Sequence, residues 1–158
     1  MSDRWVFATA FLTVVLIVAS AFAIPEYFSF ELVRSLIFVV ISVLVFFGED
    51  RYSYMLGIVA PLLLFILNIL LGGFFQEFSE LWAYIRGQHL TVLDTPLHGL
   101  AILTATVLVL LCLRAFRKQV PEKFFGRTFV VSLLISLVYV GILVGWYYHA
   151  VPAAGRMP

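Results

Sequence analysis

Arg34, Asn68, Asp94 and His98 are the residues whose types could do chemistry, and each lies in or beside a strongly apolar segment. A guanidinium inside a membrane pairs with a carboxylate, faces a cavity or reaches back to the interface, because an isolated charge is costly in hydrocarbon. Asp94 and His98 are four residues apart, so on a helix the carboxylate can orient the imidazole. We therefore treat these four residues as a candidate polar cluster for an anionic solute.

Each of these residues also has a purely structural interpretation. Arg34 can pair with Glu31, three residues earlier, and extend toward the interface. Asp94 can cap a helix, with His98 at the level of the lipid headgroups. Asn68 can form a hydrogen bond that holds two helices together. The sequence leaves both interpretations open.

The expected helices place all three histidines on the same side of the membrane. They are His89, His98 and His149. They could hold haem, a metal ion or a pigment if the fold brought them together. Cys112 is the only cysteine, so the chain has no internal disulfide. Motifs of soluble enzymes, such as HExxH, paired CxxC, a phosphate-binding glycine loop or GxSxG, do not occur. The sequence therefore identifies no catalytic residue and no cofactor.

The composition requires a membrane as the main solvent. Of the 158 residues, 63% are apolar and 12% are charged, and the mean hydropathy is +1.09. Soluble chains are about half apolar and about a quarter charged. The chain therefore predicts an all-α, polytopic transmembrane helix bundle, with residues 1–158 forming a single integral membrane domain. The net charge of +1 gives no basis for a nucleic-acid partner.

Apolar runs separated by charged turns predict five membrane-spanning helices. The first run is also compatible with a cleaved signal peptide, but its basic region is only Arg4 offset by Asp3, so we expect a retained helix. The best-marked boundary is the start of the fourth span, where Asp94 supplies a cap and Pro96 a first-turn proline. The expected spans are residues 5–24, 28–47, 52–71, 97–113 and 125–148.

Residues 73–87 predict a short amphipathic helix that lies in the membrane interface, because the segment is too short to span. Phe78 and Trp82 belong to its apolar face, whereas Glu77 and Glu80 belong to its polar face. We expect the aromatic side chains to be buried in the interface and the glutamates to be exposed. Packing of the apolar face on a partner protein is the alternative.

Lysine and arginine flank the expected spans unevenly. Because cytoplasmic loops are enriched in these residues, we expect the amino terminus inside and the carboxy terminus outside, in a bacterial inner membrane. This orientation leaves Arg34, Arg86 and Arg156 on the outer side. The basic residues on the inner side are then Arg4, Arg51, Arg114, Arg117, Lys118, Lys123 and Arg127.

The fifth span carries two pairs of small residues at four-residue spacing. Ser132 and Ser136 form one pair, and Gly141 and Gly145 form the other. Small residues allow helix backbones to approach closely. The offset between the pairs puts them on nearly opposite faces of the helix. One face can therefore pack on the chain's own bundle and the other on a second chain.

Three functions remain open from the sequence. The absent catalytic motifs and the two-sided fifth span favour a non-catalytic accessory or scaffold subunit, bound to a membrane protein partner or to further copies of the chain. The second is a carrier or transporter component with an outward-facing cavity at the candidate polar cluster. The third is a haem-, metal- or pigment-binding redox subunit that uses the outer histidines. An enzymatic activity is not indicated.

Overall fold

The helices of the computed structural model follow the apolar runs of the sequence. The structure describes residues 2–23, 27–48, 50–70, 73–87, 96–121 and 124–150. These ranges contain six helices and no strand. The helices are α1 (Ser2–Ala23), α2 (Phe28–Phe46), α3 (Asp50–Leu70), α4 (Gly73–Ile85), α5 (Pro96–Gln119) and α6 (Arg127–Ala150). Five of them, all but α4, are long and apolar enough to cross a membrane, which confirms the predicted helical transmembrane fold.

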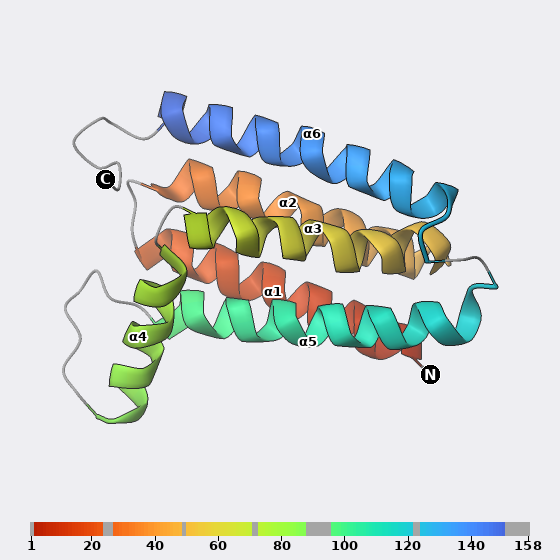
Figure 1. Ribbon diagram of the computed structural model, residues 1–158. Helices are drawn as coiled ribbons and strands as arrows, with labels where there is room; N and C mark the ends of the chain where they lie inside the picture. Colours follow the sequence, from red (N-terminus) through yellow and green to blue (C-terminus); the bar gives the residue numbers. More distant parts are fainter. Residues whose placement is uncertain are drawn as a thin grey trace.

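The five long helices run side by side, and α4 lies across one end of the bundle (Figure 1). A ring is formed by α1, α2, α3 and α5, in which α1 packs on α2 and α5, and α3 packs on the same two helices. Outside this ring, α6 lies against α3 and α2. The start of α1 and the end of α6 lie at opposite ends of the bundle (Figure 1), as an odd number of spans requires.

Basic residues gather at one end of the bundle, which we call the basic end. This end holds the start of α1, the turn from α2 to α3, the end of α5 and the start of α6 (Figure 1). A hydrogen-bonded group ties three of these helices together: the Tyr54 hydroxyl contacts the Asp3 carboxylate, and Gln119 Nε2 donates to Asp3 Oδ1 at 3.2 Å. The described basic residues of this end are Arg4, Arg51, Arg114, Arg117, Lys118 and Arg127.

Local sequence sets the ends of these helices. The turn after α2 uses Gly48 at φ +77°, a left-handed conformation that favours glycine. The fourth span was expected to end at residue 113, but α5 continues to Gln119. Arg117 and Lys118 in its last turn interact favourably with the helix dipole. The helix then ends shortly before Pro121, because proline disfavours a helical conformation at the residue before it.

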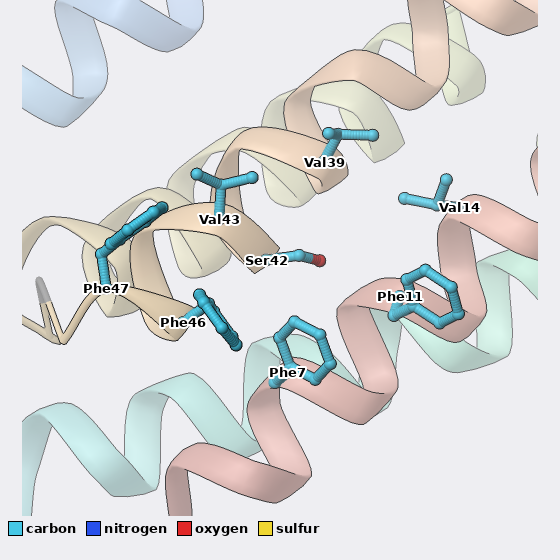
Figure 2. Close-up of a pocket in the computed structure, with 8 residues that line it drawn as sticks. All are labelled: Phe7, Phe11, Val14, Val39, Ser42, Val43, Phe46 and Phe47. Carbon is cyan, nitrogen blue, oxygen red and sulfur yellow. The ribbon is translucent and has the colours of Figure 1, made fainter.

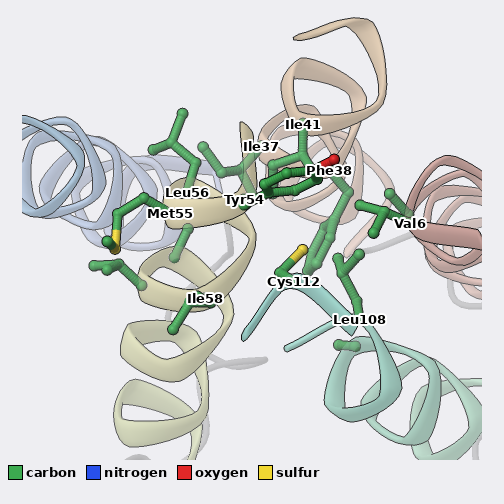
Figure 3. Close-up of a cluster of buried hydrophobic side chains, with 14 of the residues drawn as sticks. Val6, Ile37, Phe38, Ile41, Tyr54, Met55, Leu56, Ile58, Leu108 and Cys112 are labelled. Atoms are coloured by element: carbon green, nitrogen blue, oxygen red, sulfur yellow. The ribbon is translucent and has the colours of Figure 1, made fainter. Parts of the chain in front are cut away.

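The core of the ring is apolar and tightly packed (Figure 3). α3 and α5 pack closely at Gly57, where a Cβ atom would lie 2.5 Å from the Cys112 sulfur and 3.5 Å from its Cβ atom. A larger side chain at position 57 would therefore require Cys112 to move. Fully buried side chains around this contact include Ile41, Tyr54, Leu108 and Phe116.

Candidate functional site

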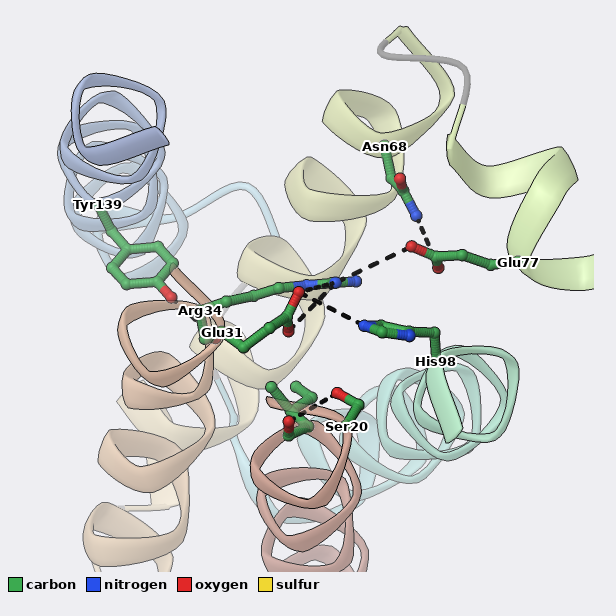
Figure 4. A network of polar contacts seen from close by, with 8 residues as sticks. Ser20, Glu31, Arg34, Asn68, Glu77, His98 and Tyr139 are labelled. Atoms are coloured by element: carbon green, nitrogen blue, oxygen red, sulfur yellow. Dashed lines mark hydrogen bonds and ion pairs between the residues drawn. The ribbon is translucent and has the colours of Figure 1, made fainter. Parts of the chain in front are cut away.

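Polar side chains from four helices meet at the end of the bundle opposite the basic end (Figure 4). We call this group the polar cluster. It brings together three of the four residues proposed from the sequence, and Asp94 lies outside the described residues. The members are Glu31 and Arg34 of α2, Asn68 of α3, Glu77 of α4 and His98 of α5.

Arg34 lies between two carboxylates. Its Nη1 atom is 3.2 Å from Glu31 Oε1 and 4.0 Å from Glu77 Oε1. The side chains of Arg34 and Glu31 are only 16% and 5% exposed, so the pair lies inside the bundle. The interaction with Glu31 is the expected contact between residues three apart on a helix. Glu77, by contrast, comes from α4, so the guanidinium also links two helices.

The two glutamates connect Arg34 to the remaining members of the polar cluster. His98 Nε2 lies 3.5 Å from Glu31 Oε1, and this contact joins α5 to α2. Asn68 Nδ2 donates to Glu77 Oε2 at 3.1 Å, which joins α3 to α4. Arg34, Asn68 and His98 are therefore brought together through Glu31 and Glu77, neither of which was proposed as a site residue from the sequence.

The polar cluster gathers two carboxylates, one guanidinium and one imidazole in a small volume inside the bundle. The carboxylates belong to Glu31 and Glu77, the guanidinium to Arg34 and the imidazole to His98. Charged groups interact strongly in a low-dielectric interior. The geometry can thus compensate the charge of a small solute.

The position of Glu77 corrects an expectation. We expected this residue on the exposed polar face of the amphipathic helix, but its side chain is only 14% exposed and contacts Arg34. The reason is the way in which α4 packs on the first turn of α5. A Cβ atom at Gly99 would lie 2.7 Å from Leu81 Cβ and 3.0 Å from the Glu77 carbonyl oxygen. This close contact fixes the rotation of α4 about its axis, so that Leu81 and Glu77 both face the bundle.

Phe78 and Trp82 of α4 are partly exposed to the surroundings of the bundle. Phe78 and Trp82 are 48% and 50% exposed, and the Arg86 guanidinium lies 4.9 Å from the centre of the Trp82 ring. Their burial in a membrane interface therefore stays a prediction, as does the interfacial role of the helix. Glu80, expected to be exposed, is half-buried.

Tyr139 attaches α6 to the bundle next to the polar cluster (Figure 4). Its hydroxyl lies 2.8 Å from the Val33 carbonyl oxygen and 2.9 Å from that of Arg34, where it can donate to either. These carbonyls belong to α2, so the contact fixes α6 against the helix that carries Glu31 and Arg34. Sequence reasoning missed this residue, because a tyrosine in an apolar helix gives no sign of the backbone that it will face.

The histidines have different environments. His98 is part of the polar cluster, His149 is exposed near the end of α6, and His89 lies outside the described residues. Within the described ranges, no group of three histidine, cysteine or acidic side chains is placed to hold a metal ion.

The two small-residue pairs of α6 also have different environments. Ser132 and Ser136 are completely buried against the bundle. A Cβ atom at Gly141 or Gly145 would have no described neighbour within 4 Å, so this face is open. We call it the glycine face.

Comparison with protein families, with curated protein sequences and with solved structures gives no match to this chain. The features that bear on function are therefore those of the chain itself. They are the buried polar cluster at one end of the bundle and the open glycine face of α6.

Proposed function

We propose that the protein is a non-catalytic accessory or scaffold subunit of a larger membrane assembly, and that a partner transmembrane helix docks on the glycine face of α6. The observation that supports this proposal is the open environment of Gly141 and Gly145 on the least buried span. Only 22% of the α6 span is buried within the chain, compared with 56% of the α3 span.

The surroundings of the glycine face suit a docked helix. Two glycines one turn apart form a shallow notch, which allows another backbone to approach closely enough for extensive van der Waals contact. Large side chains flank the notch along the same face. Leu134 and Val138 are 58% and 64% exposed, so they can pack beside an incoming helix.

The polar cluster supports a scaffold role in a different way. Its ion pairs and hydrogen bonds tie α2, α3, α4 and α5 together, and Tyr139 ties α6 to α2. Polar contacts across helices in a membrane resist sliding and rotation of the helices, because breaking them leaves polar groups in hydrocarbon. The glycine face is therefore presented on a rigid body.

A carrier component is the second candidate, and the polar cluster is the observation that favours it. Ionisable groups inside a membrane commonly mark ion or proton pathways. Here two carboxylates, a guanidinium and an imidazole gather inside the bundle. A carrier predicts solute-dependent or proton-dependent flux in reconstituted vesicles, whereas a scaffold predicts a stable complex and no flux.

Replacement of both glycines tests the scaffold proposal. Gly141→Leu combined with Gly145→Leu should abolish co-purification of the partner, or reduce the oligomer to a monomer, because leucine fills the notch. Membrane insertion should persist, since it depends on apolarity. The measurement is native mass spectrometry of the complex extracted in mild detergent. Val107→Phe is the matched control, because it adds bulk at an exposed position of α5.

A partner or oligomeric state that survives the double replacement would contradict docking on the glycine face. Equal loss in Val107→Phe would instead indicate a general effect of bulk on extraction.

We further propose that the chain resides in a bacterial inner membrane with its basic end in the cytoplasm, supported by the distribution of lysine and arginine. Reporter fusions at Arg117 and Gly155 should then report opposite sides, with Arg117 inside. Identical sidedness of the two fusions would mean an even number of crossings and would contradict the five-span layout.

A further inference from the structure

A groove runs between α1 and α2 and opens toward the surroundings of the bundle (Figure 2). Its volume is about 290 Å³. The lining is apolar, because the one hydroxyl among the lining side chains, that of Ser42, donates to the Phe38 carbonyl oxygen at 2.8 Å. The side chains that shape it are Phe7, Phe11 and Val14 of α1 and Val39, Val43 and Phe46 of α2.

Aromatic rings line the groove toward the basic end. The rings of Phe7 and Phe46 face each other across the two helices with their centres 6.2 Å apart. Phe7 and Phe11 lie nearly parallel on α1, with an interplanar angle of 8°. An apolar groove of this kind gains contacts only when an apolar group fills it, because unfilled space forfeits dispersion energy.

The dimensions of the groove fit a single hydrocarbon chain. Phe7 and Val14 are seven residues apart, which corresponds to about 10 Å along the helix. At about 290 Å³ the groove is no larger than the smallest pockets that bind small ligands, which start at about 300 Å³, so it suits part of one slender apolar group. A partner helix is about 10–12 Å across with its side chains and could insert only single side chains into this groove.

Arg4 provides a positive charge near the end of the groove that lies toward the basic end. Arg4 precedes Phe7 by three residues, Phe11 by seven and Val14 by ten, so the four residues form one stripe on α1. The Arg4 side chain is exposed, and none of the ion pairs between described residues involves it. It lies at the basic end, where the headgroups of one leaflet would meet the bundle.

We propose that Arg4 and this groove form a binding site for an anionic phospholipid. The lipid phosphate pairs with the Arg4 guanidinium, and one acyl chain lies along the groove between α1 and α2. Arg4 lies about 4.5 Å before Phe7 along the helix. The charge and the apolar residues therefore follow each other along α1 in the same order as the headgroup and the acyl chain of a lipid. One leaflet of hydrocarbon is about 15 Å deep, so a groove of about 10 Å covers most of one chain.

The test is lipid binding by the delipidated, full-length protein. We would titrate it in detergent with dioleoyl phosphatidylglycerol or with dioleoyl phosphatidylcholine, which share the same chains, and count bound lipids by native mass spectrometry. The wild-type protein should bind phosphatidylglycerol about fivefold more tightly than phosphatidylcholine, since one basic residue near lipid headgroups contributes about 1 kcal/mol.

Two variants separate the headgroup from the chain. Arg4→Gln should remove the preference for phosphatidylglycerol and leave the affinity for phosphatidylcholine unchanged. Val43→Trp should weaken binding of both lipids about equally, because the indole fills the groove. Val39→Phe provides a second groove-filling variant should Val43→Trp fail to fold. Matched controls are Arg117→Gln, an exposed arginine at the same end, and Val107→Phe, both of which should bind as the wild type does.

Four outcomes would overturn the proposal. Equal affinity of the wild type for both lipids would show that Arg4 does not select the headgroup. An equal loss of the preference for phosphatidylglycerol in Arg117→Gln would show only a general attraction of anionic lipids to the basic end. Unchanged lipid affinity in a folded groove-filling variant would show that the chain does not enter the groove. Loss of a co-purified protein in that variant, with lipid binding intact, would assign the groove to a partner instead.

Discussion

Glu31→Gln and Arg34→Gln should each destabilise the protein by about 3–5 kcal/mol, because each leaves a buried charge without its main partner. The Arg34 and Glu31 side chains are only 16% and 5% exposed, so water cannot replace the lost interaction. The measurement is unfolding in detergent by denaturant, followed by circular dichroism. Arg117→Gln, an exposed arginine at the basic end, should change stability by less than about 0.5 kcal/mol.

The combined replacement distinguishes a true ion pair from two independent effects. Glu31→Gln in the Arg34→Gln background should lower stability much less than it does alone. The Arg34 guanidinium is already absent there, so the replacement leaves no buried positive charge unpaired. Glu77→Gln should cost less than Glu31→Gln, since the Glu77 oxygen lies 4.0 Å from Arg34 and a glutamine can still accept from Asn68. Small, additive losses of about 0–1 kcal/mol would show that the pair behaves like one on a protein surface. The rigid body assumed for the scaffold would then lose its support.

The sequence was sufficient to predict the five spans, because the apolar runs are as long as a bilayer requires and charged or glycine-containing turns separate them. It was less accurate at the helix ends. The fourth span was expected to end at residue 113, but the basic residues that follow continue α5 to Gln119, because arginine and lysine are good helix formers and suit the last turn of a helix. Charge alone therefore does not mark the end of a helix.

Part of the polar cluster could also be predicted. Arg34 and Asn68 stood out as polar residues in apolar helices, and the contact between Glu31 and Arg34 follows from their spacing. Glu77 could not be predicted, because its helix has aromatic residues on one face and carboxylates on the other. The amphipathic pattern alone would place Phe78 toward the apolar side and Glu77 toward water.

The packing of α4 depends on contacts that no periodic pattern reveals. Gly99 lies in the first turn of α5, and its missing side chain is what admits Leu81 and the backbone at Glu77. The same holds for Gly57 and Cys112, whose close approach depends on how α3 and α5 cross. In a sequence, each of these glycines looks the same as Gly145, which faces open space. Tertiary structure alone distinguishes them.

Gly99→Val should therefore detach α4 from the bundle and withdraw Glu77 from the polar cluster. A Cβ atom at position 99 would lie 2.7 Å from Leu81 Cβ and 3.0 Å from the Glu77 carbonyl oxygen, and a backbone atom cannot move without moving the helix. Overpacking of this kind costs about 1–3 kcal/mol. If this cost lowers the free energy of opening α4 by the same amount, amide hydrogen exchange in residues 75–85 should accelerate about 5-fold to 150-fold.

Leu81→Ala should not rescue this variant, because alanine keeps the Cβ atom and the Glu77 carbonyl stays in place. Gly145→Val is the matched control: it makes the same substitution in a helix where a Cβ atom meets no described neighbour within 4 Å, so exchange in α4 should be unchanged. The Glu77→Gln replacement should also lose its effect in the Gly99→Val background, since the carboxylate has already left Arg34. Unaltered exchange in α4 of a folded Gly99→Val protein would mean that α4 does not dock on α5 through this glycine. Arg34 would then have to be neutralised by Glu31 without help from α4, and the position of Glu77 in the polar cluster would be wrong.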